Sequence, residues 1–509
     1  MADGAMGLIA RGAVIWPVIV PLFAAALTLL ARRHQATQRT VMEVATAAMF
    51  LSSLLLLRQV ANGDVVVMRF GGWSSPFGVS FAADRLGAAL SAVTGMIGVA
   101  CAIYARADVR AQRRRAGFDP LFLGMLAAVN GAFLTGDLFN LYVWFELMLV
   151  AAMGLVSLDR RPPQVDGVIR YAVMSMLGAT CILLGIALLY GEVGVLDMNA
   201  LSSLLTGRSP TVALSASAYL MITGFALKAG LFPLFFWLPA SYPTAPITVS
   251  AALAGLLTKV GFYAALRASV TVFHMTDELS PVPGLPSVLI VLAVGTMVVA
   301  VLAAIAQVDL RRMMSYHIAC QVAYMVLGLA LATELGIGAA IFYMIHSMLV
   351  QTGLFLGAGA MARVGGSFDL RRLGGLARRH PAIAGAFATL ALSISGIPPF
   401  SGFWAKFLVV DAALRANAPW LALVAIVVGF LTLHSMATLW AQAFWRPTPD
   451  SLKKLRGVPP AMITAVALLA ACTLGIGLAV EPVSSFARAA ATQMLMDVGG
   501  FAAVVGGGR

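Results

Sequence analysis

Long apolar runs, separated by short polar segments, recur along the whole chain. An apolar run of roughly 20 residues is long enough for one helix to cross the hydrocarbon core of a bilayer. The runs lie, within a few residues at each end, at 13–31, 41–57, 84–105, 120–135, 138–158, 171–190, 212–238, 247–266, 286–306, 313–331, 336–362, 381–410, 420–445 and 459–480. The pattern predicts an all-α polytopic membrane protein with about 14 transmembrane helices.

The polar segment between the second and third runs has a pattern of its own. Valines at positions 65–67 precede Gly71 and Gly72, and another apolar stretch follows at 77–81. β-Branched and aromatic residues on both sides of a glycine pair favour two strands joined by a turn. We therefore expect a small β-hairpin outside the membrane, and no large soluble domain elsewhere.

Two runs contain helix-breaking residues near their centres. Pro233 interrupts the seventh run, and Pro398 and Pro399 interrupt the twelfth. Proline has no N–H, and its ring crowds the carbonyl four residues earlier, so it breaks a helix interior. Broken helices five positions apart predict two five-helix repeats, helices 4–8 and 9–13. An odd number of helices in each makes the repeats inverted in the membrane.

These breaks suggest a division of the chain into four parts. The expected parts are N-terminal helices 1–3 with the external hairpin (1–119), the first repeat (120–266), the second repeat (286–445), and the last helix with the C-terminal tail (459–509).

The composition excludes a soluble protein. Of the 509 residues, 61% are hydrophobic and 11% are charged, whereas soluble domains are about half apolar and about a quarter charged. No phosphate-binding loop, dinucleotide fingerprint or nucleophile elbow occurs, so we expect neither an enzyme nor a cofactor. The four cysteines lie singly in apolar runs, and we therefore expect neither disulfides nor a bound metal.

The net charge of +13 follows from an uneven distribution of Lys and Arg. If the first helix runs inward, the cytoplasmic connections carry 22 of these residues and the outer segments carry nine. Cytoplasmic loops of membrane proteins collect Lys and Arg. The bias predicts that both termini lie outside, and it explains the basic composition without nucleic acid.

The remaining basic residues, Lys228, Lys259 and Lys406, lie within the runs, as does the carboxylate of Glu146. An ionisable residue at a helix centre costs about 2.5–3.5 kcal/mol on insertion scales. Such residues need partners, water or a function, and a proton relay would use all four. His346, central in the eleventh run, is a further candidate for proton exchange.

Simpler interpretations remain for all of these residues except Lys259, which lies too far from the ends of its run to reach the membrane surface. Glu146 and Lys228 could form a structural ion pair, Lys406 could extend to the membrane surface, and His346 could form only an interhelical hydrogen bond. His317 and His434 fit a structural role better than a relay.

Four stretches carry a resemblance to a known family: GDLFNLYVWFE at 136–146, LKAGLFPLFFWLP at 227–239, LTKVGFY at 257–263, and GIPPFSGFWAK at 396–406. With them the chain resembles the antiporter-like, proton-translocating family shared by respiratory complex I and the Mrp multisubunit cation/proton antiporters. The resemblance covers nearly the whole chain and is strongest to the D subunits of the Mrp antiporters.

The resemblance implies a role for each buried ionisable group. Glu146 and Lys228 would form the charge pair of the first half, Lys259 would bridge the halves, and Lys406 would end the relay, with His346 between them. One position departs from the family pattern: Gln351 stands where relatives often have lysine.

The implied function is that of a proton-translocating subunit of a multisubunit Na+/H+ antiporter in a bacterial-type plasma membrane. Its implied partners are a large related A subunit, small membrane subunits, protons and Na+. A proton-pumping subunit of a complex I-type NADH-quinone oxidoreductase remains an alternative within the family. A structural scaffold, whose charges only hold helices together, is the alternative outside it.

Overall fold

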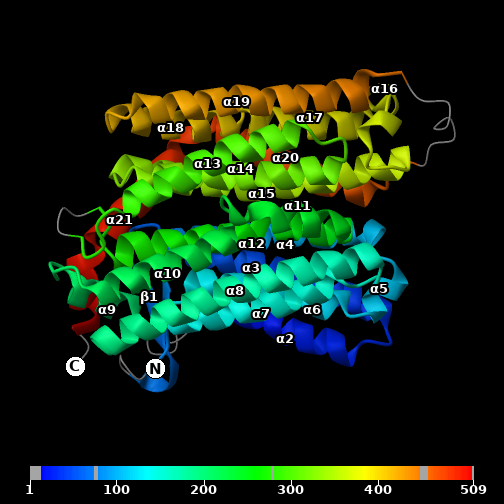
Figure 1. Ribbon diagram of the computed structural model, residues 1–509. Helices are drawn as coiled ribbons and strands as arrows, with labels where there is room; N and C mark the ends of the chain where they lie inside the picture. The colour runs from blue at the N-terminus through cyan, green and yellow to red at the C-terminus, as the bar shows by residue number, and fades with distance from the viewer. Residues whose placement is uncertain (1–12, 74–77, 277–279, 448–456, 507–509) are drawn as a thin grey trace.

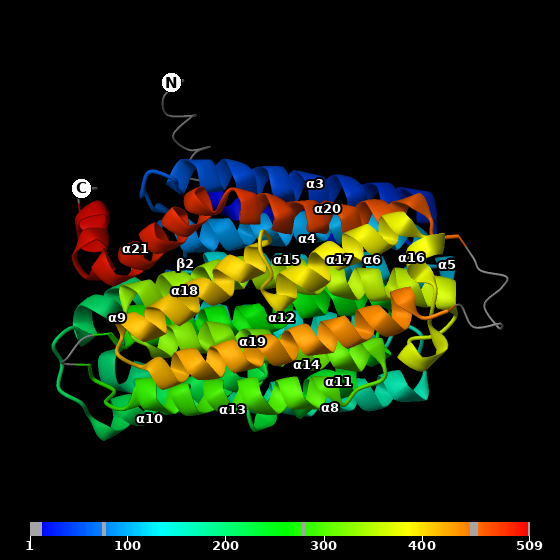
Figure 2. The same ribbon diagram turned by 90° about the horizontal axis from the view of Figure 1, so that it is seen from above.

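The computed structural model describes residues 13–73, 78–276, 280–447 and 457–506, and the chain forms one bundle of long helices (Figure 1). The helices run roughly parallel to one long direction, so the connections gather at two ends. The hairpin, α9 and α21 lie at one end, whereas α5 and α16 lie at the other (Figures 1 and 2).

Among the described residues, twelve helices are long and apolar enough to cross a bilayer. They are α2 with a preceding 3-10 turn (Ala13–Leu30), α3 (Gln35–Val60), α4 (Arg85–Asp108), α7 (Leu138–Val156), α8 (Pro162–Val193), α10 to the turn η4 (Val212–Thr244), α12 with a π-helical end (Ile247–Val272), α13 (Leu285–Ile305), α14 (Leu310–Ala330), α15 (Glu334–Gly365), α19 with a π-helical end (Pro419–Trp445) and α20 (Pro460–Leu478). The predicted all-α membrane class is therefore confirmed.

Two further apolar helices, α6 (Phe118–Leu134) and α17 (Pro381–Ser395), are shorter. The total of fourteen spans thus stays a prediction. The remaining α-helices lie at the ends of the bundle or beside the breaks: α5 (Ala111–Arg115), α9 (Met198–Leu205), α11 (Trp237–Ser241), α16 (Leu376–Arg379), α18 (Ser401–Arg415) and α21 (Val480–Gly506).

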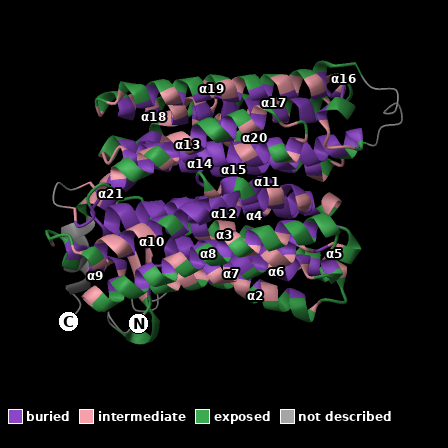
Figure 3. Ribbon diagram, in the orientation of Figure 1, coloured by how far each residue is buried: buried purple, intermediate pink, exposed green. Residues whose placement is uncertain are grey.

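The core of the bundle lies around α12 and α15. Every residue of α12 up to Arg267 is buried, and α15 is buried over nearly its whole length. The outer faces of α8, α13 and α19 instead expose apolar side chains such as Leu184, Val291 and Phe430 (Figure 3). This burial pattern suits a bundle whose polar groups face inward and whose rim faces lipid.

The segment after α3 forms the expected hairpin. Strand β1 (Val66–Arg69) pairs antiparallel with β2 (Ser80–Ala83), in a register that places Val66 opposite Ala83. Strand β2 leads directly to Asp84, whose side chain caps α4 by accepting a hydrogen bond from the Gly87 N–H at 2.8 Å. The hairpin therefore fixes the start of a buried helix.

Both helices with central prolines are interrupted. Helix α10 ends at Ala229, because Gly230 takes a φ of 75°, and the chain continues through Pro233 to α11. Helix α17 ends at Ser395, Gly396 takes a φ of 86°, and α18 begins at Ser401. In each case a glycine in a left-handed conformation ends the helix before the first proline.

The same backbone arrangement occurs twice, 172 residues apart (309 − 137 and 369 − 197). Asp137 forms an isolated antiparallel bridge with Asp197, and Asp309 forms one with Asp369. Asp137 caps α7 and Asp309 caps α14. Helix α9 follows Asp197 and helix α16 follows Asp369, and these two helices lie at opposite ends of the bundle (Figure 1). The duplication therefore supports two repeats that are inverted relative to each other. The inverted repeats themselves remain a prediction.

Candidate functional site

Lys228 lies in the last turn of α10, beside the break. Its Nζ donates a hydrogen bond to the Ser175 hydroxyl of α8 at 2.7 Å and lies 5.4 Å from the centre of the Phe145 ring. Glu146 is the next residue on α7, and the carboxylate interacts electrostatically with Lys228. Among the described residues no ion pair joins the two side chains within 4.0 Å, and Glu146 Oε1 is buried without a hydrogen-bond partner.

A small cavity of about 10 Å³ adjoins Lys228, with Ser175, Tyr171 and Trp237 in its wall. This volume is close to the minimum that holds one water molecule. Trp237 spans the break, because its Nε1 donates to the Leu227 carbonyl at 3.2 Å. The break therefore places a buried ammonium group, a hydroxyl and space for a water together.

Lys259 lies on α12 and is fully buried. Its Nζ donates to the Ala254 carbonyl of the same helix at 2.7 Å. Near Lys259, α12 packs closely against the end of α10. A Cβ atom added at Gly261 would lie only 2.6 Å from the backbone nitrogen of Ala229, so only glycine fits there. Glycine at position 261 thus brings the helix of Lys259 against the turn that carries Lys228.

Lys406 and His346 both lie at the second break. Lys406 Nζ donates to the carbonyl of Ser395, the last residue of α17, at 3.0 Å. His346 Nδ1 hydrogen-bonds the hydroxyl of Ser401, the first residue of α18, at 2.8 Å. Lys406 therefore turns inward to the break instead of extending to the membrane surface, and it interacts electrostatically with His346.

Unpartnered polar side chains lie on the two buried helices between these sites. Neither amide atom of Gln351 on α15 has a partner among the described residues, nor do the hydroxyls of Ser347 and Thr258. Gly255 of α12 packs against Thr352 of α15, so the two helices that carry these groups are in direct contact. Buried polar groups without partners are costly, so these side chains are polar positions within an otherwise apolar core.

Ser347 and Thr258 were not among the residues singled out from the sequence. Serine and threonine within apolar helices usually bond back to their own helix, so no signal in the sequence distinguishes them. His317, by contrast, hydrogen-bonds Ser435 through Nε2 at 3.0 Å, which agrees with the expected structural role.

Arg267 directly follows the predicted run 247–266 and forms a buried ion pair that the sequence does not reveal. It ends the α-helical part of α12, is 9% exposed, and pairs with Asp84 at 2.5 Å. Its Nε also donates to the Tyr263 hydroxyl at 3.0 Å. A cation at a helix end resembles a loop residue in the sequence, and only the fold brings Asp84 to it.

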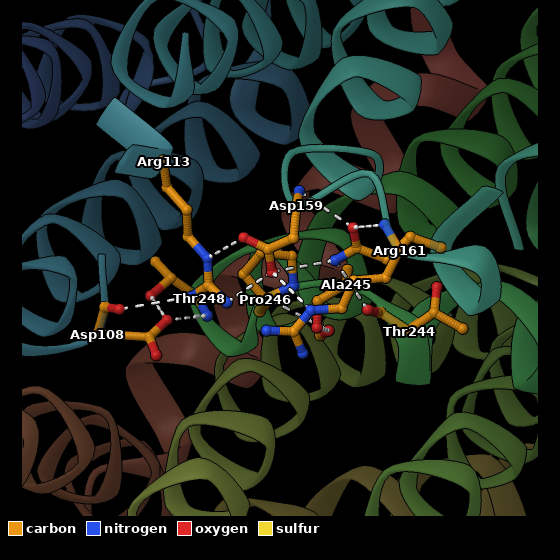
Figure 4. Close-up of polar contacts among 10 residues, drawn as sticks. Asp108, Arg113, Asp159, Arg161, Thr244, Ala245, Pro246 and Thr248 are labelled. Carbon is orange, nitrogen blue, oxygen red and sulfur yellow. Dashed lines mark hydrogen bonds and ion pairs between the residues drawn. The ribbon is translucent and has the colours of Figure 1, made fainter. Parts of the chain in front are cut away.

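A polar cluster holds the connections at the opposite end together (Figure 4). Arg113 pairs with Asp159 at 2.7 Å, and this hydrogen-bonded guanidinium holds the pKa of Asp159 below its ordinary value. Asp108, the last residue of α4, accepts from the N–H and hydroxyl of Thr248 at 3.1 and 2.7 Å. Asp108 therefore caps α12, the helix that carries Lys259.

Comparisons with known proteins identify the family of this chain. A family model described as "NADH:quinone oxidoreductase/Mrp antiporter, TM" matches residues 135–432. The D subunit of the Na(+)/H(+) antiporter of Alkalihalophilus pseudofirmus is 37% identical over 483 residues, which are 95% of this chain and 97% of that protein. The D subunit of the Na(+)/H(+) antiporter of Bacillus subtilis is 31% identical, also over 95% of this chain and 97% of that protein.

A solved structure is similar along nearly the whole length. One chain of the Mrp complex from Dietzia sp. superposes with a TM-score of 0.88 and 29% sequence identity, covering 96% of this chain and 98% of that chain. The segment matched by the family model contains both helix breaks and the four ionisable residues within the predicted runs, Glu146, Lys228, Lys259 and Lys406. This chain is thus a member of the NADH:quinone oxidoreductase/Mrp antiporter family of membrane proteins.

Proposed function

We propose that this chain is the proton-translocating membrane subunit of a multisubunit Na+/H+ antiporter. One observation carries the proposal: a lysine lies beside each of two helix breaks, buried at the first and partly buried at the second, and a third lysine lies on the wholly buried α12. The relatives, which are named as D subunits of Na(+)/H(+) antiporters, support this function over that of a complex I-type subunit.

In the proposed relay, protons move from Lys228 through Lys259 and His346 to Lys406. Glu146 sets the energy of the charge on Lys228, because the attraction between two charges depends on their distance. The last turn of α10 can change this distance, since Gly230 and Pro233 leave it without a continuing helix. Unpartnered groups such as Gln351 and Ser347 can hold water along the path.

The other expected properties follow as parts of the same proposal. Like the relatives, which are named as antiporter subunits, this chain works with other membrane subunits, including a large related A subunit. The complex exchanges Na+ for protons across a bacterial plasma membrane. Both termini lie outside, as the distribution of Lys and Arg indicates.

Sodium-dependent dissipation of ΔpH tests this function. Vesicles come from an antiporter-deficient host that expresses the full gene cluster, and pull-down verifies that the complex assembles. With Lys228→Ala we expect exchange to be lost in an assembled complex. Lys453→Ala, which removes a lysine outside the predicted spans, serves as the control and keeps exchange. Wild-type exchange by an assembled Lys228→Ala complex would refute the relay.

A further inference from the structure

A cavity of about 450 Å³ opens between the start of α8, the segment around α11, and the connection that precedes α14. Three arginines and one aspartate line it, which leaves a formal charge of +2 (3 − 1). The arginines are Arg161, Arg311 and Arg312. Two of its lining residues, Arg161 and Thr244, belong to the polar cluster drawn in Figure 4, so the cavity adjoins that cluster.

The charge of Arg161 is only weakly balanced. Its nearest carboxylate, Asp159, lies 4.0 Å away and is already bound by Arg113 at 2.7 Å. Gln164 also donates to the Asp159 carboxylate, at 3.3 Å. The Arg161 guanidinium therefore keeps free donors toward the cavity.

Arg312 likewise lacks an anion. Asp309 binds the neighbouring Arg311 at 3.1 Å, and its other oxygen accepts the backbone N–H groups that begin α14. For the Arg312 guanidinium the described residues provide no hydrogen-bond or ion-pair partner. Two arginine side chains from separate parts of the chain thus line one cavity: Arg161 has only a 4.0 Å contact with a carboxylate that Arg113 already binds, and Arg312 has no carboxylate partner among the described residues.

The size and surroundings of the cavity indicate its ligand. The volume is within the range of about 300–1,000 Å³ typical of small-molecule sites. Guanidinium groups bind phosphate oxygens in pairs and with favourable geometry. The adjoining turns of α8 and α13 expose Val165, Ile169 and Leu302 to the membrane side. A phosphate in the cavity would therefore have apolar surface beside it for acyl chains.

We infer that this cavity is a binding site for the phosphate headgroup of an anionic phospholipid, held by Arg161 and Arg312. The acyl chains lie along the exposed apolar residues of α8 and α13. Such a lipid joins the first half of the chain, through Arg161, to the second half, through Arg312. The site is separate from the relay and does not depend on the proposed function.

A crosslinking experiment tests the inference without any transport measurement. The full-length chain, purified with the subunits that accompany it, is placed in phosphatidylcholine nanodiscs with a trace of photoreactive phosphatidylglycerol. Mass spectrometry maps the crosslinks, and unlabelled phosphatidylglycerol competes for the site. Two variants are compared with the wild type. The first combines Arg161→Gln with Arg312→Gln, and the second, Ala240→Phe, fills the cavity while leaving its charges unchanged. The control, Arg33→Gln with Arg115→Gln, removes two exposed arginines outside the cavity.

We expect crosslinks at residues 161–169 in the wild type and the control. Loss of two arginines should weaken the apparent affinity about thirtyfold, and Ala240→Phe should abolish these crosslinks. If the control weakens the apparent affinity equally, the lipid is attracted by general surface charge and not by this cavity. If the crosslinks persist in Ala240→Phe, the lipid binds outside the cavity. Displacement by millimolar inorganic phosphate as complete as by phosphatidylglycerol would make it a site for soluble phosphate, and would overturn the lipid assignment.

Discussion

Lys406 closes the break in its own span by donating to the carbonyl oxygen of Ser395, eleven residues earlier, at 3.0 Å. That carbonyl belongs to the last residue of α17 and has no continuing helix to bond with. The charge also lies 5.5 Å from the centre of the Tyr324 ring, which attracts cations. The ammonium group is therefore held at the break by the backbone that the break exposes.

This arrangement predicts the effect of removing the charge at position 406. In Lys406→Met the side chain keeps its length and its apolar contacts, so we expect assembly near the wild-type level. Exchange should fall at least about tenfold, in the lower range of losses for a proton-transfer group. Sodium-dependent ΔpH dissipation measures this, with the exposed Phe407→Leu as the control. Equal rates in Lys406→Met and wild type would remove Lys406 from the relay.

The hydrogen bond between Ser175 and Lys228 makes a second prediction. Bonds to charged groups contribute about 1.5–3 kcal/mol, so Ser175→Ala should change the energy of the charged lysine. We expect the pH dependence of exchange to shift, while Ser175→Thr, which keeps a hydroxyl, stays close to the wild type. Thr180→Ala on the exposed part of the same helix is the control. An unchanged pH profile in Ser175→Ala would show that Ser175 does not position Lys228.

The buried pair of Asp84 and Arg267 predicts a loss of stability. Asp84→Asn keeps an oxygen that can cap α4 but leaves the Arg267 charge unpaired. Breaking a buried pair in this way costs about 3–5 kcal/mol. A thermal unfolding assay in detergent should therefore show a lower midpoint for Asp84→Asn. Adding Arg267→Met should recover part of the loss; a double variant less stable than Asp84→Asn would contradict this account.

Asp137 predicts a pH-dependent stability. Burial, together with the facing Asp197, raises the pKa of Asp137 to about 6, although hydrogen bonds from the start of α7 oppose the rise. Between the ordinary value of about 3.9 and 6, the folded chain binds more protons than the unfolded chain. The contribution of Asp137 to stability is therefore complete at low pH and is lost as the pH rises through 6.

Asp137→Asn removes this titration and keeps a side chain suited to capping a helix. We expect the variant to unfold at a higher temperature than the wild type at pH 8, and the difference to shrink at pH 5. The exposed Asp166→Asn, at the opposite end of the bundle, should show no such dependence. An identical difference at both pH values would mean that the Asp137 carboxyl does not titrate in this range.

Periodic and compositional features can be recognised without a structure because bilayer physics acts on each segment separately. A run of about 20 apolar residues must form a helix to satisfy its backbone in lipid. A lysine within such a run is conspicuous for the same reason, so Lys228, Lys259 and Lys406 stood out from the sequence. The two helix breaks followed from Pro233, Pro398 and Pro399, since proline acts locally.

The partners of these residues were decided only by tertiary structure. Ser175 lies 53 residues from Lys228, and Asp84 lies 183 residues from Arg267. No local rule connects such positions, because a hydrogen bond depends on which helices pack together and at what depth. The packing at Gly261, where α12 contacts α10, is one such contact. The sequence by itself therefore determined which ionisable groups lie within apolar runs and where two of those runs break, whereas the fold decided which neighbours each group has and that Asp84 and Arg267 are buried together.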